Sequence, residues 1–213
     1  EEKDINPNLK TGEIDLLLDK IKIFSKSKLP PFEIEDRITI SDDLRLKYRY
    51  LDLRRPKMKK NLEARNIIRQ IVRESLLELN FIEVETPFLI KTTPEGARDF
   101  VVPSRLHKGK CYALPQSPQI FKQLLMVAGF DRYFQFATCF RDEDLRADRS
   151  FTHTQIDMEM SFVDEQDVFQ VVEYYISKVF ERFLGQKLNT PFMIMDYDEA
   201  ISRFGIDKPD LRF

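Results

Sequence analysis

The chain has 213 residues, of which 42% are hydrophobic and 33% are charged. This composition is too apolar for a disordered chain and too charged for a membrane protein, and it allows one sizeable core or one domain with part of a second. The formal net charge of −2 excludes a protein that coats nucleic acid through its overall charge, so any such contact must be local. No apolar run approaches the roughly 20 residues that cross a bilayer, so a cytoplasmic location and no membrane partner are expected.

The first forty residues differ in character from the rest of the chain. Two short runs, residues 13–18 and 20–24, look like strands, and the sequence SKSKLPPF follows them. The adjacent Pro30 and Pro31 forbid a helix and hold the backbone extended, which predicts a linker. Because two short strands do not form a stable domain alone, they are expected to belong to a larger unit or to pack on the main body.

Residues 45–60 (RLKYRYLDLRRPKMKK) form the main basic segment, which contains eight basic side chains and one acidic side chain, that of Asp52. Such a run indicates either a local contact with nucleic acid or an ordinary solvated basic face. The composition of the segment does not decide between these interpretations.

A long amphipathic helix is predicted over residues 59–79, where apolar side chains recur at intervals of three and four. Asn80 is expected to end this helix. Residues 81–86 (FIEVET) alternate and carry β-forming side chains, which predicts a strand that Pro87 ends or holds at a sheet edge.

Further strands are predicted at residues 100–103, 111–114, 133–140 and 155–162, and helices at 118–128 and 164–184. A helix followed by strands with irregular connections is typical of the α+β class, an antiparallel sheet with helices packed on it. The sequence has no glycine-rich phosphate loop of the dinucleotide or P-loop kind, so ATP would have to bind in another way.

The two cysteines, Cys111 and Cys139, lie among apolar residues without metal-ligand spacing and are predicted to be buried, reduced thiols. The two histidines, His107 and His153, are too isolated to predict a metal site.

The segment 133–162 carries the densest pattern of polar residues: a strand, a charged loop at 141–149 and a returning strand. On the return, Gln155, Asp157, Glu159 and Ser161 alternate with apolar residues, so one face of the strand is polar. This face is predicted to form the floor of a binding site, with an ordinary half-exposed antiparallel strand as the alternative.

The stretch from FRDE (140–143) to TQID (154–157) resembles motif 2 of the class II aminoacyl-tRNA synthetases. KTTPEGARDFVVPSR (91–105) and YALPQSPQIFKQLLM (112–126) are similar to the bacterial-type aspartyl-tRNA synthetases. The predicted helix followed by FIEVETP resembles motif 1, and RYLDLRRP (49–56) and DKPDLRF (207–213) also match this family. The resemblance implies a class II catalytic core and an aspartate–tRNA ligase that uses ATP, with tRNA and aspartate as partners, Mg²⁺ as cofactor and a homodimeric state.

The resemblance also implies roles for matched positions. The residues implied to bind aspartate are Glu95, Ser117, Gln119, Ile120, Phe121, Lys122, Arg141, Gln155 and Asp157. Those implied to bind ATP are Arg141, Asp142, Glu143, Ser150 and His153. Arg146 and Arg149 would reach the tRNA, Pro87 would lie at the dimer interface, and Arg141 would be catalytic.

Two of these roles have a direct physical reason. The planar fork of Arg141 can hold the α-phosphate and the amino-acid carboxylate together. Lys122 would pair with the side-chain carboxylate of aspartate, and Asp157 would neutralise its ammonium group. His153 departs from the family, which usually has a phenylalanine that stacks on adenine; an imidazole ring can also stack.

The same resemblance predicts the domain organisation. Residues 1–28 would be the end of an N-terminal anticodon-binding OB-fold, 29–58 a linker or hinge, and 59–213 the first part of the catalytic domain. Motif 3 and the magnesium ligands are not in the sequence, so the chain is expected to be a partial version that is inactive alone. Alternatives are an asparaginyl- or lysyl-type synthetase and a non-catalytic RNA-binding paralogue.

Overall fold

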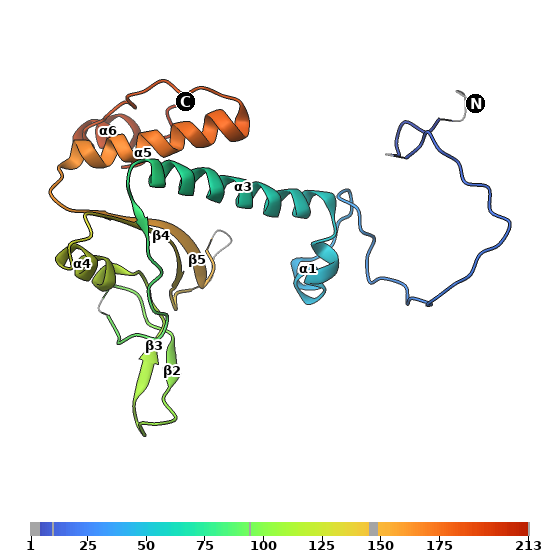
Figure 1. The fold of residues 1–213 in the computed structure, drawn as a ribbon, viewed down its shortest axis with the longest axis horizontal. Coiled ribbons are helices and arrows are strands. Elements are labelled where there is room, and N and C mark those ends of the chain that lie inside the picture. The colour runs from blue at the N-terminus through green and yellow to red at the C-terminus, as the bar shows by residue number, and fades with distance from the viewer. Residues whose placement is uncertain (1–4, 10, 94, 145–148, 213) are drawn as a thin grey trace. The chain divides into compact units, whose positions relative to one another are not determined.

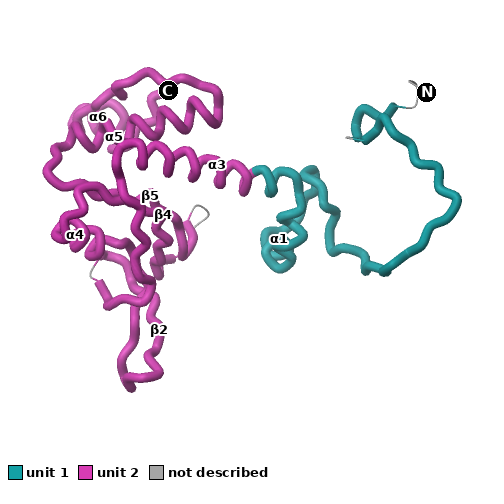
Figure 2. The backbone as a smooth tube through the Cα atoms, in the orientation of Figure 1, with its two compact units in different colours: residues 1–60 teal, residues 61–213 magenta. Residues whose placement is uncertain are grey.

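The computed structural model describes residues 5–9, 11–93, 95–144 and 149–212. The chain divides into two compact units, residues 1–60 and 61–213, shown in different colours in Figure 2. The helices are α1 (Asp42–Lys47), α2 (Arg49–Asp52), α3 (Pro56–Glu78), α4 (Gln119–Val127), α5 (Glu165–Val179), the π-helix η2 (Phe180–Leu184) and α6 (Tyr197–Phe204). The strands are β1 (Ile82–Glu83), β2 (Val101–Pro103), β3 (Cys111–Ala113), β4 (Arg132–Phe140) and β5 (Thr152–Met160).

The prediction of strands at residues 13–18 and 20–24 is wrong, because neither run forms a strand. Their side chains are open to solvent, as Leu17 at 101% and Phe24 at 89% exposure illustrate. A strand needs a neighbour to accept its backbone hydrogen bonds, and the described part of this unit offers none. The predicted linker contains two short helices, α1 and α2.

Asp52 organises the basic segment. It is fully buried and receives hydrogen bonds from Arg45 (Nε to Oδ1, 3.2 Å), Arg55 (Nη1 to Oδ1, 3.0 Å) and Arg49. Arg55 also donates to the backbone carbonyl of Glu35 at 3.0 Å. Three of the eight basic residues are therefore engaged with one internal carboxylate, so the segment is not a uniformly solvated face.

The helix predicted at 59–79 is confirmed and begins earlier, at Pro56, whose fixed φ suits a first helical position. Asn80 ends it as predicted: its φ is 60°, and the amide of Phe81 returns to the carbonyl of Leu76 at 3.0 Å. The buried side chains of α3 fall on one stripe, Ile71, Val72, Ser75 and Leu76.

The larger sheet has the order β1-β4-β5. Strands β4 and β5 form the predicted antiparallel pair, in register from Arg132 opposite Met160 to Phe140 opposite Thr152. Of the strand predicted at 81–86, only Ile82 and Glu83 pair, and they run parallel to β4. A second, two-stranded sheet joins β2 and β3 antiparallel.

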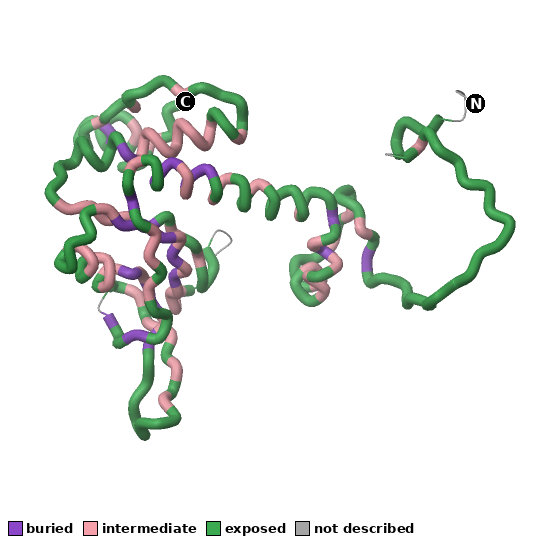
Figure 3. Tube along the Cα trace, viewed as in Figure 1, coloured by how far each residue is buried: buried purple, intermediate pink, exposed green. Residues whose placement is uncertain are grey.

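One face of β4–β5 packs on helices. Val72 and Leu76 of α3 form a buried cluster with Phe81, Phe134 of β4 and Val171 of α5. Figure 1 shows α3 and α5 on the same side of this sheet, and Figure 3 shows buried segments where they meet it. The alternation predicted for β5 holds through Met160, since Met158 and Met160 pack against this cluster.

Several boundaries differ from the predicted ones. β5 ends at Met160, and Phe162, expected to be an inward-facing strand residue, is fully exposed at 101% with a φ of 57°. Helix α5 is confirmed and begins at a capping box between Asp164 and Asp167. Helix α6 was not predicted. Cys139 is buried as expected, but Cys111 is exposed, because β3 belongs to the small sheet and not to the core.

Candidate functional site

The face of β4–β5 opposite the helical core is polar. Asp157 of β5 accepts a hydrogen bond from Lys122 of α4, whose Nζ lies 3.1 Å from Oδ1. The same Nζ lies 3.3 Å from Oε2 of Glu159, two residues further along β5. Lys122 and Asp157 expose only 13% and 8% of their side chains, so this charge cluster is largely shielded from water.

Asp157 is held in an unfavourable environment for a carboxylate. Burial raises its pKa from the ordinary value of 3.8, and this effect outweighs the lowering by the neighbouring Lys122. Its second oxygen, Oδ2, is buried and makes no hydrogen bond of ordinary geometry among the described residues; the buried Tyr133 hydroxyl interacts with this carboxylate and lowers its pKa, but it too has no bonded partner among them. A buried carboxylate oxygen without a donor is suited to an incoming cation or donor group, because pairing removes its desolvation cost.

Glu95 and Ser117, two more residues of the predicted aspartate group, bond each other before the start of α4, the helix that carries Lys122. The hydroxyl of Ser117 donates to Glu95 at 2.6 Å and also accepts from the amide of Gln119 at 3.3 Å. A cavity of about 160 Å³ is lined by Glu95 and Ser117 with Ile120 and Phe121 of α4. Five of the predicted aspartate-binding residues therefore share this corner of the fold.

The predicted ATP group gathers at the open end of β4–β5. Arg141 directly follows β4, and its amide donates to the carbonyl of Phe151 at 2.9 Å. A polar cavity of about 390 Å³ is lined by Arg141, Glu143, Arg149, Ser150 and His153. Arg149 and Glu143 lie 3.7 Å apart, so this predicted tRNA residue faces a predicted ATP residue. Arg146 lies outside the described residues.

Strand β5 links the two groups. His153, Gln155, Asp157 and Glu159 occupy alternate positions and share one face of the strand. Gln155 lies between the nucleotide-side His153 and Asp157, and it accepts a contact from the Cys139 thiol at 3.3 Å. From His153 to Asp157 the strand spans about 13 Å, a distance that a bound adenylate could bridge.

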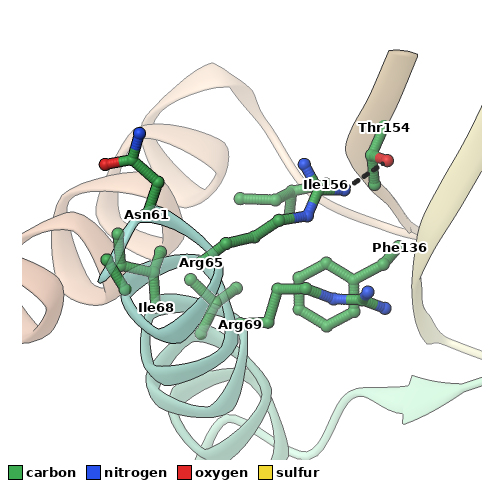
Figure 4. Close-up of a pocket in the computed structure, with 9 residues that line it drawn as sticks. Asn61, Arg65, Ile68, Arg69, Phe136, Thr154 and Ile156 are labelled. Atoms are coloured by element: carbon green, nitrogen blue, oxygen red, sulfur yellow. Dashed lines mark hydrogen bonds between the residues drawn. The ribbon is translucent and has the colours of Figure 1, made fainter. Parts of the chain in front are cut away.

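A separate groove lies behind the sheet. It has a volume of about 370 Å³ and is lined by residues of α3 with Phe136, Thr154 and Ile156, which face away from Asp157. Figure 4 shows Arg65 and Arg69 entering it: Arg65 donates to Thr154 at 2.7 Å, and Arg69 stacks over Phe136 at 4.6 Å. It contains none of the predicted site residues.

Pro87 does not take part in either group. It is exposed and follows β1, and Phe88 and Leu89 beside it are each 53% exposed. Among the described residues, no group of three or more histidine, cysteine or acidic side chains could hold a metal ion. No helix in the described ranges is long and apolar enough to cross a membrane.

Comparison with known proteins identifies the family. Residues 41–213 match the family model described as tRNA synthetases class II (D, K and N). The chain belongs to this family.

Curated relatives cover nearly the whole chain. The Aspartate--tRNA(Asp/Asn) ligase of Caldanaerobacter subterraneus subsp. tengcongensis is 60% identical over 211 residues, 99% of this chain and 36% of that protein. The proteins of the same name from Oleidesulfovibrio alaskensis and Aquifex aeolicus are each 57% identical over 98% of the chain, which covers 34% of each of them. This class II synthetase chain thus spans about a third of the length of its curated relatives.

A solved structure confirms the class II fold. The crystal structure of a putative aspartyl-tRNA synthetase from Leishmania major Friedlin superposes with a TM-score of 0.64 at 24% identity, covering 74% of this chain and 32% of that one. The predicted α+β synthetase core is confirmed, and nothing in the comparison bears on the N-terminal OB-fold remnant.

Two further residues, Glu159 and Gln116, have no role in the sequence prediction but take part in the hydrogen bonds and ion pairs around this class II site. Glu159 was assigned to the polar face but given no role, although the spacing Gln155-Asp157-Glu159 already placed it beside Asp157. Gln116 was also missed; it is only 1% exposed and bonds the backbone of residue Ala97. Gln116 lies within the motif at 112–126, but its partners are 17 to 19 positions away along the chain, so the motif does not reveal its role.

Proposed function

We propose that this chain is part of an aspartate–tRNA ligase, which activates aspartate with ATP to aspartyl-adenylate and transfers the aspartyl group to the 3′ end of tRNA. The names of the curated relatives support this function. The observation that carries it is the buried Lys122–Asp157 pair with a free oxygen on Asp157. This arrangement suits an amino acid with an ammonium group and a second carboxylate.

In the proposed aspartate pocket, Asp157 receives the substrate ammonium and Lys122 pairs with the side-chain carboxylate. Asparagine would be rejected because its neutral amide leaves the shielded Lys122 ammonium without a new anionic partner. Gln155, Ser117 and Gln119 supply hydrogen bonds around the substrate, and Glu95 closes over it. Ile120 and Phe121 line the apolar wall.

In the first proposed step, an oxygen of the α-carboxylate of aspartate attacks the α-phosphorus of ATP. A new carboxyl–phosphate bond forms, the bond between the α-phosphorus and the bridging oxygen breaks, and pyrophosphate leaves. Arg141 stabilises the charge that develops on the α-phosphate oxygens, so it acts more strongly on the transition state than on the ground state. The substrate is itself the nucleophile, and the protein contributes position and charge.

The nucleotide is proposed to occupy the polar cavity next to Arg141. Glu143 would accept from the adenine amino group, His153 would stack on the ring, and Asp142 and Ser150 would contribute further polar contacts. Arg149, with Arg146, is proposed to contact the tRNA acceptor end. With tRNA bound, Arg149 would give up its ion pair with Glu143, 3.7 Å away, and pair with a phosphate of the tRNA.

The remaining assignments concern the whole protein. We propose a cytoplasmic homodimer with Pro87 at its interface, an OB-fold that residues 1–28 complete, a hinge at 29–58 and a catalytic domain that starts at residue 59. Mg²⁺ would be bound by residues outside this chain, and no step above depends on it.

Arg141→Ala tests the mechanism in a protein of the relatives' full length. Aspartate-dependent exchange of pyrophosphate into ATP is expected to fall by about 100-fold or more, since one preorganised transition-state contact contributes on this order. The melting temperature should stay unchanged, because Arg141 is partly exposed at a strand end. Near-normal exchange would contradict the proposed role.

Amino-acid dependence separates this function from its alternatives. Aspartate alone should support exchange in the unsubstituted protein. Exchange with asparagine or lysine would favour the other synthetase types, and no exchange with any amino acid would favour a non-catalytic RNA-binding protein. Because the relatives' name includes both the aspartate and asparagine tRNAs, charging of each should be measured.

A further inference from the structure

Gln116 is a buried polar residue without a role in the proposed chemistry. It is 1% exposed, and its side-chain amide faces the loop of residues 95–99. Its Oε1 accepts from the amide of Ala97 at 3.2 Å, and its Nε2 donates to the carbonyl of Ala97 at 2.8 Å and to the carboxylate of Asp99. An amide satisfied in this way links Gln116 to the middle of the loop, because breaking these bonds would leave buried donors and acceptors without partners.

The same loop also bonds the segment that follows β4 and carries the residues proposed to bind the nucleotide. Arg98 and Asp142 form an antiparallel bridge, in which the amide of Asp142 donates to the carbonyl of Arg98 at 3.0 Å. The side-chain Nε of Arg98 also donates to the carbonyl of Asp142 at 3.3 Å. Arg98 lies between Ala97 and Asp99, so a three-residue segment is fixed on one side by Gln116 and on the other by Asp142.

The start of the loop belongs to the aspartate side, where Glu95 accepts from Ser117 at 2.6 Å. Ser117 follows Gln116 directly, and Asp142 follows Arg141 directly. A further hollow of about 320 Å³ lies between the loop and the nucleotide side, lined by Ala97, Arg98, Asp142 and Glu143 among others. One loop therefore lines the aspartate-side cavity and a hollow that shares Glu143 and Arg149 with the nucleotide cavity.

We propose that Gln116 is a positioning residue that couples the binding of aspartate to the binding of ATP; this inference rests on the proposed function. Aspartate orders the loop through Glu95. The bonds from Gln116 then fix Ala97 and Asp99, and with them Arg98, which lies between these two residues. Arg98 bonds the backbone of Asp142, so the backbone next to Arg141 is also ordered. ATP then binds to a nucleotide side that is already ordered, and by linkage ATP favours aspartate to the same extent.

The test compares ATP-site affinity with and without aspartate in a protein of the relatives' full length. The probe is α,β-methylene-ATP, which cannot form the adenylate, and the readout is its dissociation constant by titration calorimetry. In the unsubstituted protein, saturating aspartate is expected to tighten binding by about 5- to 150-fold. Gln116→Glu keeps the size of the side chain but removes both donor bonds and sets a carboxylate against Asp99. The Gln116→Glu substitution should bring the ratio of the dissociation constants without and with aspartate close to one. The affinity for the ATP analogue in the absence of aspartate should change by less than about twofold.

Two variants make the result specific. Asp99→Asn in the Gln116→Glu background restores a donor–acceptor pair between these side chains and should recover much of the coupling. Gln123→Glu, at an exposed position of the neighbouring helix α4, introduces the same charge and should leave the ratio unchanged. If Gln116→Glu does not fold, Arg98→Leu carries the test, because Arg98 is exposed and its loss should lower the ratio without lowering the melting temperature.

Three outcomes would overturn the inference: a ratio of one in the unsubstituted protein, a full ratio in Gln116→Glu, or a variant that binds each ligand more weakly alone while keeping the ratio. The last would mean that Gln116 only stabilises the fold. Absence of aspartate-dependent pyrophosphate exchange in the unsubstituted protein is a different result, since it would refute the proposed function itself.

Discussion

At the scale of single residues, the site is defined by one cation shared between two carboxylates. Lys122 reaches Asp157 at 3.1 Å and Glu159 at 3.3 Å, so the cluster carries an excess negative charge before any substrate binds. In the proposed pocket, a substrate ammonium would pair with Asp157, and the two carboxylates of aspartate would take Lys122 and Arg141 as partners. Arg141 is therefore needed beside Lys122, because aspartate has a negative net charge that this cluster alone does not offset.

Asp157→Asn should separate stability from function. Because burial raises the pKa of Asp157, the folded state holds its proton more tightly than the unfolded state, and the stability from this group is lost as pH rises from 3.8 through the folded pKa. At pH 7.5 the neutral asparagine removes that cost, so calorimetry should show a higher melting temperature. In a protein of the relatives' full length, kcat/KM for aspartate should fall by about 30-fold or more, as for loss of one partner of a buried charge pair.

The matched control for this change is Asp19→Asn, at an exposed position, which should alter neither quantity. A lower melting temperature for Asp157→Asn at pH 7.5 would mean that the Lys122 contact outweighs the cost of burial. Unchanged kcat/KM would remove Asp157 from the aspartate pocket.

At the scale of elements, α3 packs against the apolar face of the β4–β5 sheet. The opposite face, with its polar side chains, is thereby held in a fixed orientation. Leu76 is fully buried in the cluster, whereas the adjacent Leu77 is 50% exposed. Leu76→Ala should lower the free energy of unfolding by about 2–5 kcal/mol, since it leaves a cavity, and Leu77→Ala by less than about 1 kcal/mol. Urea denaturation of both variants measures this; equal losses would contradict the packing described.

The short helices α1 and α2 depend on Asp52. Hydrogen bonds from Arg45 and Arg55 outweigh the effect of its burial and lower the pKa of Asp52 below 3.8. The stabilisation is therefore present above pH 3.8 and is lost as pH falls through the folded pKa. Asp52→Asn should reduce hydrogen-exchange protection of α1 and α2 by tenfold or more, since each charge-assisted bond contributes about 1.5–3 kcal/mol.

Asp42→Asn is the control for Asp52. Asp42 also contacts Arg45, at 2.9 Å, but its side chain is 83% exposed, so its loss should change protection very little. Equal effects of the two substitutions would show that Asp52 is not the organising residue.

At the scale of the whole molecule, the N-terminal segment tests the proposed domain organisation. Leu16, Leu17 and Phe24 are 80%, 101% and 89% exposed, and a chymotrypsin-like protease should cleave there first in the isolated chain. In a protein of the relatives' full length, a completed OB-fold should slow these cuts by about tenfold or more. Leu106, 85% exposed in the other unit, serves as the reference site. Equal rates in both proteins would contradict an OB-fold that includes residues 1–28.

The sequence by itself determined the elements that have a local cause. Apolar spacing gave the helix ending at Asn80, and polar–apolar alternation gave the β4–β5 pair with Gln155, Asp157 and Glu159 on one face. These patterns survive because each residue's side is set by the backbone geometry of its own element. Family motifs added the aspartate–tRNA ligase assignment, which periodicity could not supply.

Only the tertiary structure decided what depends on distant partners. The runs at 13–18 and 20–24 have strand-like composition, but no strand lies next to them in the part of the chain that the structure describes. Cys111 is exposed because its strand joins a small sheet outside the core, and three arginines of the basic segment turn inward because Asp52 is buried among them. Gln116 and its loop partners meet only after folding. Backbone pairing and desolvation both act between segments, and a linear pattern does not record which segments come together.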